Sequence, residues 1–336
     1  MQTQTLRITR LDPDDEAGVQ QYVAVANAAS ALDSPWEHPR TVHQIGGLLR
    51  RGWDGDAPHA FLAHDGSGTA VGALEVWVND WDNVDLAWLW LVVRPDHRRR
   101  GVGSALMEHA FGTARELGRT KLGIDGWDSS EAPAAFAARH GFAWASQAIN
   151  RRQHLREVDL AQVQGMYDDA AAAAHDYELV RIEGRTPDDL IEQVAEMVAA
   201  INDAPLDELD LEDEVFPPER VRRYEETQAL NGNRLYRLVA RHRGSGELAG
   251  HTVVAVEIER PATGEQHDTS VVRSHRGHRL GLLLKAGMVL WLAETEPQLE
   301  TVDTWNAESN DHMIAVNEQL GYRALGRGVQ YQRRLA

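Results

Sequence analysis

The chain has 336 residues, no cysteine and a formal net charge of −18 at pH 7, and these values exclude several classes of protein. Without cysteine, disulfides, cysteine-ligated iron–sulfur clusters and a cysteine nucleophile are excluded, which fits a reducing cytoplasm. The acidic balance argues against nucleic acid as a partner, because clustered basic residues bind its phosphates. The length is large for one core and predicts two domains.

The termini and apolar runs give no sign of a membrane partner. The first residues do not resemble a signal peptide, and no apolar run approaches the roughly 20 residues that span a bilayer. We therefore expect a soluble, cytoplasmic protein. An acidic surface also favours the approach of cationic amines, although simple solubility is the more common reason for such a surface.

Strands and helices alternate through the first half of the chain. This alternation favours an α/β (α+β) fold, in which a mixed sheet has helices on both faces. In chain order, the patterns predict a strand over 6–11, helices within 13–53, strands near 60–64, 70–78 and 86–93, a helix over 101–117, a strand over 120–125, a helix over 130–139 and a strand over 142–148.

The second half repeats this order after an alanine-containing stretch. We expect an N-terminal domain over 1–160, a helical linker over 161–177 and a C-terminal domain over 178–336. The acidic stretch over 207–214 is predicted to be a solvated loop or a helix entrance. The second set of elements comprises strands over 179–182, 235–241, 248–258 and 267–272, a helix over 280–294, a strand over 300–305, a helix over 310–319 and a strand over 323–333.

The most informative motif joins the strand over 86–93 to the following helix. Residues 93–103 read V-R-P-D-H-R-R-R-G-V-G, so a strand passes through a proline turn into a basic, glycine-containing loop. Such a loop lets backbone N–H groups converge on a phosphate at the positive end of a helix. The spacing matches neither the dinucleotide fingerprint nor the nucleotide-triphosphate loop.

A related pattern occurs a second time. Residues 271–281 read V-V-R-S-H-R-G-H-R-L-G, with Arg276 at the position of Arg98 and Arg279 at the position of Gly101. A Gly-Phe pair at 141–142 and a Gly-Tyr pair at 321–322 close comparable segments after each loop. Two loops with matching flanks indicate a tandem repeat, and their clustered arginines suit a small polyanion such as coenzyme A.

The pattern V-x-P-x-x-R-x-x-G-x-G resembles the pyrophosphate-binding loop of the GNAT superfamily of acyl-CoA N-acyltransferases. The resemblance spans nearly the whole chain, which looks like the tandem GNAT proteins of the mycothiol synthase type, although the end of the chain is not a close match to that enzyme. It implies two tandem GNAT folds, each with a mixed, mostly antiparallel sheet. It also implies acetyl-CoA as donor and the amine of a small molecule as acceptor, while a homodimer stays an option. The alternative is an acyl-CoA-binding sensor, or a degenerate pair, without turnover.

The resemblance assigns the coenzyme to corresponding places in the two domains. In GNAT enzymes the strand before the loop splays from its neighbour, and the pantetheine lies in the gap. In the first domain the implied contacts are Leu91, Val92, Val93, Arg98, Arg99, Arg100, Gly101, Val102, Gly103 and Ser104. In the second domain they are Val271, Val272, Arg276, Gly277, His278, Arg279, Leu280, Gly281, Asn306, Asn310 and Asn317.

Two of these assignments have alternatives. Arg279 either adds charge to the second loop or closes the site, because a side chain stands where the first loop has glycine. Asn310 either contacts the coenzyme or caps the helix that follows it.

The candidates for the general base are glutamates on the strand before each cleft. GNAT enzymes often use such a carboxylate, and the resemblance implies Glu75 and Glu257, at positions that we expect to be comparable. A carboxylate in an apolar strand is costly to bury unpaired, so it faces a cleft or solvent. His251 and His267 are alternatives in the second domain.

The general acid is where the sequence departs from the family. Many GNAT enzymes have a tyrosine four residues before the glycine-aromatic ending, but these positions hold Ala137 and Asn317. Asn317 is able to hydrogen-bond a thioester or pantetheine, whereas Ala137 is not. No metal site is predicted, since His275 and His278 lie within the loop.

Overall fold

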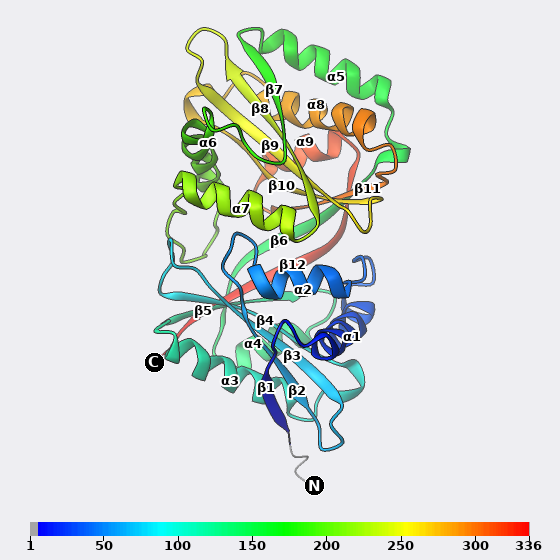
Figure 1. Cartoon of the computed structure of the whole chain (residues 1–336), viewed down its shortest axis with the longest axis vertical. Helices are drawn as coiled ribbons and strands as arrows, with labels where there is room; N and C mark the ends of the chain where they lie inside the picture. Colours follow the sequence, from blue (N-terminus) through cyan, green and yellow to red (C-terminus); the bar gives the residue numbers. More distant parts are fainter. Residues whose placement is uncertain (1–5, 336) are drawn as a thin grey trace. The chain divides into compact units, whose positions relative to one another are not determined.

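The computed structural model describes residues 6–335, and the chain divides into two compact units (Figure 1). Unit 1 contains the residues up to Gln147, the segment Leu206–Glu212 and the residues from Gly326 onward. Unit 2 contains Ala148–Pro205 and Asp213–Leu325. The two units therefore interleave along the chain, unlike the consecutive segments 1–160 and 178–336 that the sequence suggests.

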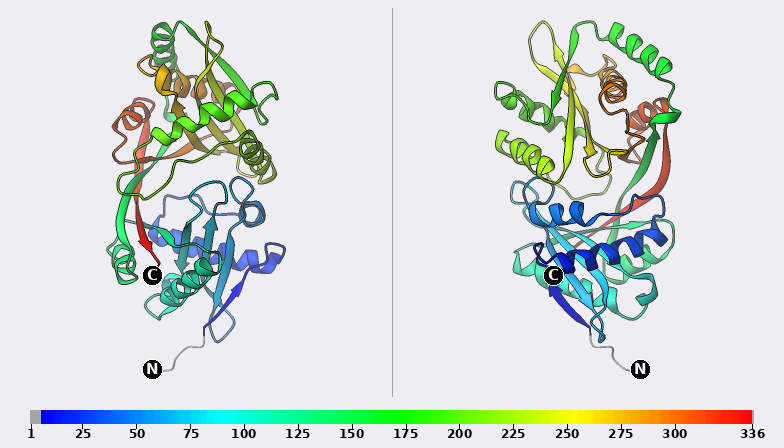
Figure 2. Two further views of the ribbon diagram at one scale, coloured as in Figure 1. Left: turned by 90° about the vertical axis from the view of Figure 1, so that its left-hand side faces the viewer. Right: turned by 45° about the vertical axis from the view of Figure 1, so that its right-hand side comes forward.

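Unit 1 is built on a mixed sheet with helices on both faces (Figures 1 and 2). Only β4 and β5 are parallel neighbours, and the other neighbouring pairs are antiparallel. Alternate residues of the strands face opposite sides, so α3 packs on one face while α1 and α2 cover the other. The strand order is β1 (Arg7–Arg10), β2 (His59–His64), β3 (Ala70–Val78), β4 (Leu86–Val93), β5 (Lys121–Trp127) and the end of β12 (Tyr322–Arg334). The helices are α1 (Glu16–Asp33), α2 (Val42–Arg51), the short 3-10 helix η1 (Pro95–His97), α3 (Val102–Glu116) and α4 (Ala132–Arg139).

Unit 2 repeats this architecture. Its parallel pair is β10 with β11, and the other neighbouring pairs are antiparallel. Helices α5 and α8 pack on one face, and α6 and α7 pack on the other. The strand order is β7 (Tyr177–Glu183), β8 (Asn233–His242), β9 (Leu248–Glu257), β10 (Thr263–Val271), β11 (Thr301–Ala307) and the end of β6 (Ala143–His154). The helices are η2 (Leu155–Glu157), α5 (Leu160–Ala173), α6 (Ile191–Val198), η3 (Ala199–Asp203), α7 (Pro218–Leu230), η4 (Arg273–His275), α8 (Leu280–Thr295) and α9 (Asp311–Gln319).

The last strand of each sequence half pairs in the sheet of the other half. Residues 148–154 of β6 pair with β11 in unit 2, and residues 328–334 of β12 pair with β5 in unit 1. The expectation that each half ends in a strand of its own sheet is therefore wrong. An apolar alternation specifies that a segment is a strand and which face it buries, but it does not specify a partner.

The segment expected to be a helical linker is instead part of the unit 2 core. Residues 160–173 form α5, whose buried Val163 and Ala170 belong to the same apolar cluster as Leu284 and Met288 of α8. Burial of that helix face stabilises the helix and makes the stretch part of unit 2 rather than a spacer between domains.

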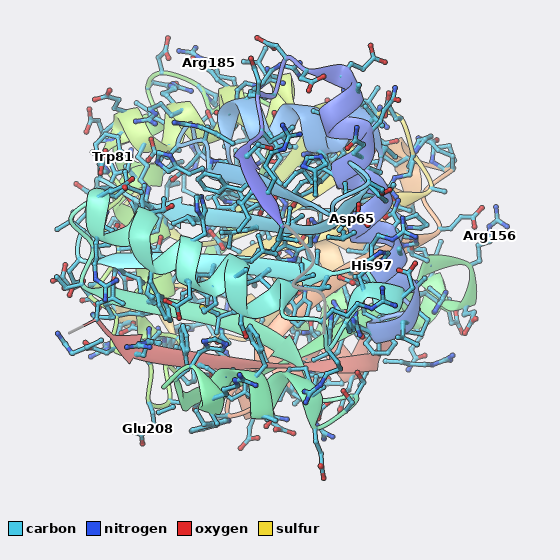
Figure 3. All side chains as sticks on the ribbon, turned by 90° about the horizontal axis from the view of Figure 1, so that it is seen from below. Asp65, Trp81, His97, Arg156, Arg185 and Glu208 are labelled. Carbon is cyan, nitrogen blue, oxygen red and sulfur yellow. The ribbon has the colours of Figure 1, made fainter. Side chains whose placement is uncertain are left out.

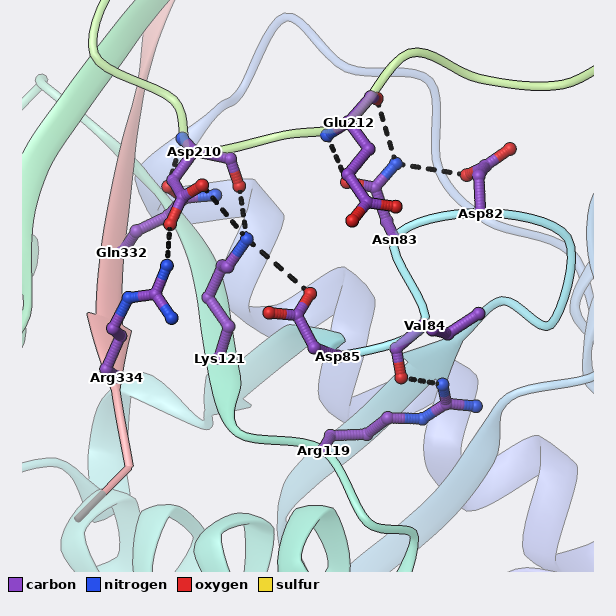
Figure 4. A network of polar contacts seen from close by, with 10 residues as sticks. All are labelled: Asp82, Asn83, Val84, Asp85, Arg119, Lys121, Asp210, Glu212, Gln332 and Arg334. Carbon is purple, nitrogen blue, oxygen red and sulfur yellow. Dashed lines mark hydrogen bonds and ion pairs between the residues drawn. The ribbon is translucent and has the colours of Figure 1, made fainter.

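The acidic segment Leu206–Glu212 is a bound strap rather than a solvated loop (Figure 4). The backbone N–H of Asp210 donates to the side chain of Gln332 on β12 at 2.8 Å. The ammonium of Lys121 on β5 donates to the carbonyl oxygen of Asp210 at 2.7 Å and lies 3.2 Å from its carboxylate. These contacts lower the pKa of Asp210, chiefly through the hydrogen bond from Lys121.

Candidate active site

The two basic loops have the same backbone conformation despite their different sequences. We call residues 94–101 loop 1 and residues 272–279 loop 2. Loop 1 has left-handed φ angles at Arg99 (62°) and Gly101 (88°), and loop 2 has them at Gly277 (88°) and Arg279 (59°). Each loop thus uses glycine at one of its two left-handed positions and arginine at the other, which a non-glycine residue adopts only at some cost.

Arg279 is accommodated by the loop rather than displacing it. A Cβ atom built on its counterpart, Gly101, would meet no heavy atom within 4 Å. Arg279 itself is exposed and begins α8 in the same left-handed conformation with which Gly101 begins α3. The geometry therefore favours the reading in which Arg279 adds charge to the loop.

The helices that follow the loops start without capping side chains. No side chain accepts a hydrogen bond from the first turn of α3 or α8, whereas Thr41, Asp159 and Asn310 cap α2, α5 and α9. The first N–H groups of α3 and α8 are thus left to an anion. Asn310, by contrast, accepts from the N–H of Met313 at 3.2 Å, so its contact in this structure is helix capping.

The exposed arginines of the loops suit a pyrophosphate. Arg99, Arg100 and Arg279 make no hydrogen bond or ion pair with any residue in the range 6–335. Their guanidinium groups are therefore able to face phosphate oxygens beside the helix N-termini, which is the arrangement that the predicted coenzyme requires.

Arg98 has a different role from its exposed neighbours. Its Nε donates to the carbonyl oxygen of Val93 at 3.1 Å, and its two Nη groups donate to Asp33 at the end of α1 at 2.8 and 2.6 Å. Nearby, Nε2 of His97 lies 3.7 Å from the carboxylate of Asp65 (Figure 3). These contacts hold loop 1 to the end of β4, so Arg98 acts here by positioning the loop.

Arg276 makes the corresponding contacts in unit 2, and we call this arrangement, in which an arginine of the loop joins a strand carbonyl oxygen to a carboxylate, the clamp. Its Nε donates to the carbonyl oxygen of Val271 at 3.1 Å, and its Nη2 donates to Asp203, at the end of η3, at 2.6 Å. Arg273 also pairs with Asp203, which lowers the pKa of that carboxyl. The clamp occurs in both units, so it is a shared structural feature of loops 1 and 2.

Each parallel strand pair separates just before its loop. Strands β4 and β5 pair in register only as far as Leu89 with Ile124, and β10 and β11 only as far as Glu265 with Asp303. Residues 90–93 and 266–271 therefore continue beyond the paired part of the ladder. This separation matches the gap expected for pantetheine, with the predicted residues 91–93 and 271–272 along its edge.

Glu75 is a buried and fully hydrogen-bonded carboxylate. It is 2% exposed, and its two oxygens accept from the hydroxyl of Tyr22 and from Nε1 of Trp77, the latter at 2.8 Å. Burial raises the pKa of Glu75, against the opposing charge of Arg40. These hydrogen bonds give Glu75 a structural role. Its role as a general base, which the family resemblance implies, stays a prediction.

Glu257 lies farther from its loop than Glu75 does. By the register of β3 with β4 and of β9 with β10, the counterpart of Glu75 is Val253, so the expectation of comparable positions is wrong. Glu257 is the last residue of β9, and both its oxygens accept from Arg260 at 2.8 Å. The carboxylate of Glu257, which the sequence suggests as a base, is therefore held in an ion pair with Arg260.

Glu265 is the carboxylate that the sequence reasoning missed. It is the last residue of β10 paired with β11, and its side chain is solvent-accessible. The protein groups packed around part of this side chain desolvate it, and the carboxylates of Asp303 and Glu257 repel a second negative charge, so the pKa of Glu265 is raised to about 7. A base with that pKa is well matched to neutral pH. The signal was a lone glutamate upstream of the loop, just outside the strand predicted to start at 267.

The strand that carries Glu265 is irregular beside it. The register of β10 against β9 shifts between Gln266 and Thr269, as in a β-bulge, which leaves His267 and Asp268 outside the paired residues. The hydroxyl of Tyr224 lies 2.5 Å from Nδ1 of His267. Burial and the charge of Arg237 lower the pKa of His267 to about 3, so this imidazole is neutral at working pH and a weak base.

The positions where many GNAT enzymes have tyrosine are both buried. Ala137 is part of the unit 1 core. Asn317 is fully buried, and its Nδ2 donates to Oδ1 of Asn306 at 2.6 Å, so these two predicted coenzyme contacts meet each other. Neither position supplies a proton donor of tyrosine type.

Two further features of residues 6–335 concern membranes and metals. No helix in this range is both long and apolar enough to cross a membrane. The same range contains no group of three or more His, Asp or Glu side chains arranged to hold a metal ion.

Comparison with known proteins identifies the family. A model of the acetyltransferase (GNAT) family matches residues 26–142. A tandem GNAT protein from the clavulanic acid biosynthesis pathway, solved without AcCoA, is 30% identical over 98% of each chain, with a TM-score of 0.80. A GCN5-related N-acetyltransferase from Sphaerobacter thermophilus shares the fold, with a TM-score of 0.68 at 14% identity over 98% of this chain and 95% of its own. A mycothiol acetyltransferase of Parafrankia sp. (strain EAN1pec) is 41% identical over 68 residues, which is 20% of each protein. The chain thus belongs to the GNAT acetyltransferase family and has its tandem, two-domain form.

Proposed function

We propose that the protein is an acetyl-CoA-dependent N-acetyltransferase that acts on the amine of a small molecule, and that transfer takes place in unit 2. The observation that carries this proposal is Glu265, a solvent-accessible carboxylate with a pKa near 7 at the point where β10 leaves β11. Family membership supports the acyltransferase class, and loop 2 has the same backbone as loop 1.

Acetyl-CoA would supply the acetyl group as a thioester, with its pyrophosphate at loop 2 and the start of α8. Glu265 would accept the proton that the amine loses as its nitrogen bonds to the carbonyl carbon and the carbon–sulfur bond breaks. Backbone N–H groups at the β10 bulge would stabilise the negative charge on the carbonyl oxygen. The leaving thiolate would take its proton from water, since no tyrosine occupies position 317.

Unit 1 is better suited to binding than to transfer. Its candidate base, Glu75, is buried and already holds two hydrogen bonds, and β4 shows no register shift against β3. Loop 1 and the start of α3 nevertheless keep both glycines of the pattern, Gly101 and Gly103, together with a helix start without a capping side chain and two unpaired arginines. We therefore propose that unit 1 holds a coenzyme with little or no turnover of its own.

Single substitutions of the three glutamates test this division of roles. Glu265→Gln should lower turnover by about 10²–10⁴-fold, because a general base is lost, with the affinity for acetyl-CoA unchanged. Glu257→Gln and Glu75→Gln are the matched controls and should keep most of the activity. Thiol release, with mass spectrometry of the product, is the measurement. Wild-type turnover in Glu265→Gln would remove the assignment.

The second candidate is a coenzyme-binding sensor, favoured by the absence of tyrosine at positions 137 and 317. A sensor would bind acetyl-CoA tightly and yield no acetylated product with any amine of a broad panel. An acetylated amine formed at the rate of thiol release would exclude the sensor, whatever the identity of the base.

A further inference from the structure

Three of the buried polar side chains of unit 2 that have atoms without hydrogen-bond partners lie on neighbouring strands, namely His251, Ser270 and Arg237. His251 is 1% exposed, and both its ring nitrogens are unpaired among the described residues. The hydroxyl of Ser270 and Nη1 of Arg237 are likewise buried and unpaired within residues 6–335. A buried polar group without a partner costs about 1–3 kcal/mol, so such groups are normally satisfied by a ligand or by water.

The three side chains are neighbours on one face of the sheet. His251 of β9 is the register partner of Ser270 of β10, which places their Cβ atoms about 5 Å apart. Arg237 of β8 is the partner of Val253, so it is diagonal to His251 and about 7–8 Å away, within reach of a long side chain. Val239, the direct partner of His251 on β8, packs against α6 and α7, so all three side chains lie on that face.

The positive charge of Arg237 is only partly balanced. Its Nη2 lies 3.6 Å from Oε1 of Glu225, too long for a hydrogen bond. Glu225 is engaged elsewhere, because Arg222 and the hydroxyl and N–H of Thr186 donate to it. A second anion beside Arg237 would therefore be stabilised.

The charge of Arg237 also affects the pKa values of the titratable groups around it. Burial raises the pKa of Asp268, and the charge of Arg237 partly offsets this rise. Burial and then the charge of Arg237 lower the pKa values of His251 and His267 to about 3. Both imidazoles are therefore neutral, and each has one N–H to donate. Glu265 lies on the same face, where it raises the pKa of Tyr224 as a minor contributor.

These groups match one ligand chemistry. Nη1 of Arg237, the hydroxyl of Ser270 and one ring N–H of His251 are three donors, and a carboxylate offers acceptor oxygens to all of them. We propose that Arg237, His251 and Ser270 bind a carboxylate of the acceptor, so that the substrate is an amine that carries a carboxylate at its far end. The inference rests on the proposed function, since Glu265 marks the amine end.

The spacing of the strands sets the length of that acceptor. Glu265 pairs with Ala255, which is two residues along β9 from Val253, and Arg237 lies one strand beyond. Strand geometry separates the two ends by roughly 10 Å. Several atoms must therefore lie between the amine and the carboxylate, as in an ω-amino acid or a dipeptide.

Matched substrate pairs test the proposal in the full-length protein. The probes are 6-aminohexanoate against 6-aminohexanamide, and glycylglycine against glycylglycinamide. At least one carboxylate should be preferred about tenfold or more in kcat/KM, mainly through KM. Ser270→Ala and Arg237→Gln should reduce that preference to about threefold or less, whereas Ser245→Ala, on the exposed β8–β9 hairpin, should leave it unchanged. Equal use of carboxylate and amide by the wild type would overturn the proposal.

A binding measurement separates failure of this proposal from failure of the proposed function. With coenzyme A present, titration of 6-aminohexanoate should shift the ring ¹⁵N signals of His251, and the amide should not. If no amine is acetylated but these signals shift, the carboxylate site stands and the enzyme assignment fails. If neither probe or both probes shift them, or if crystals soaked with 6-aminohexanoate show only water at His251, the carboxylate site is wrong.

Discussion

Asp33 and Asp203 act on loops 1 and 2 through hydrogen bonds from Arg98 and Arg276. Each carboxylate is about one-quarter to one-third exposed, so its contribution to the free energy of unfolding should be below about 1 kcal/mol. Its main effect is to keep the loop backbone in place.

Removal of the unit 2 clamp should therefore weaken coenzyme binding more than stability. We expect Asp203→Asn to raise KM for acetyl-CoA by about three- to tenfold with kcat nearly unchanged, since each tenfold loss in affinity is about 1.4 kcal/mol. Asp33→Asn is the matched variant, and it should weaken a separate binding event in calorimetry without changing KM. A fall in kcat with constant KM would contradict the positioning role.

Glu265 should give the enzyme a distinctive pH profile. A general base acts in its ionised form, so kcat/KM should rise about tenfold per pH unit below pH 7 and level off above it, given a pKa raised to about 7. The rise should be absent from Glu265→Gln. A profile of Glu265→Gln that keeps the same inflection would assign it to another group.

The site could be predicted from sequence only where its signal is local. Loops 1 and 2 were found because arginines, glycines and a helix start lie within eleven residues of one another. Glu265 was not found, because its raised pKa comes from desolvation by the packed protein and then from the charges of Asp303 and Glu257, which only the folded sheet brings close to it. The clamps to Asp33 and Asp203 depend on tertiary packing in the same way.

At the scale of elements, α8 carries a buried lysine at the position where α3 carries Met107. Lys285 is 2% exposed, its ammonium donates to Gln266 at 3.1 Å, and burial lowers its pKa to about 7. Between pH 7 and its ordinary pKa of 10.5, the unfolded chain binds this proton more tightly than the folded protein does. Stability from this group therefore rises with pH across that window.

Lys285→Met should stabilise unit 2 by a few kcal/mol near pH 7, because the cost of burying the charge disappears. The gain should shrink as the pH rises toward 10.5, above which wild-type Lys285 is mostly neutral in both states. Urea unfolding at pH 6, 8 and 10 measures the difference. A stabilisation that does not depend on pH would show that packing, not charge, is the cause.

The elements themselves were largely predictable, whereas their partners were not. Helices α3 and α8 begin within one residue of their predicted starts, because loop chemistry marks them. By contrast, the sequence of α5 was interpreted as a linker, because each alanine buries little surface. The helix becomes part of a core only by packing on α8. The exchanged pairing of β6 and β12 left no local trace in the sequence.

At the scale of the whole molecule, unit 1 is assembled from three separate parts of the chain. Deletion of residues 326–336 should leave β5 as an unpaired edge, which favours aggregation. We expect faster amide exchange in β5 and a lower melting temperature for unit 1. A synthetic peptide of residues 326–336 should restore protection, and protection of β5 without the peptide would contradict this account.

The late position of β12 in the chain has a consequence for biosynthesis. About 200 residues separate β5 from its partner, and a ribosome that adds about 5–20 residues per second needs roughly 10–40 s to produce them. During that interval β5 has left the ribosome but its neighbouring strand does not yet exist. The nascent chain must be shielded from neighbouring chains on a polysome, and an mRNA truncated near its 3′ end would yield a product whose first-made sheet can never close.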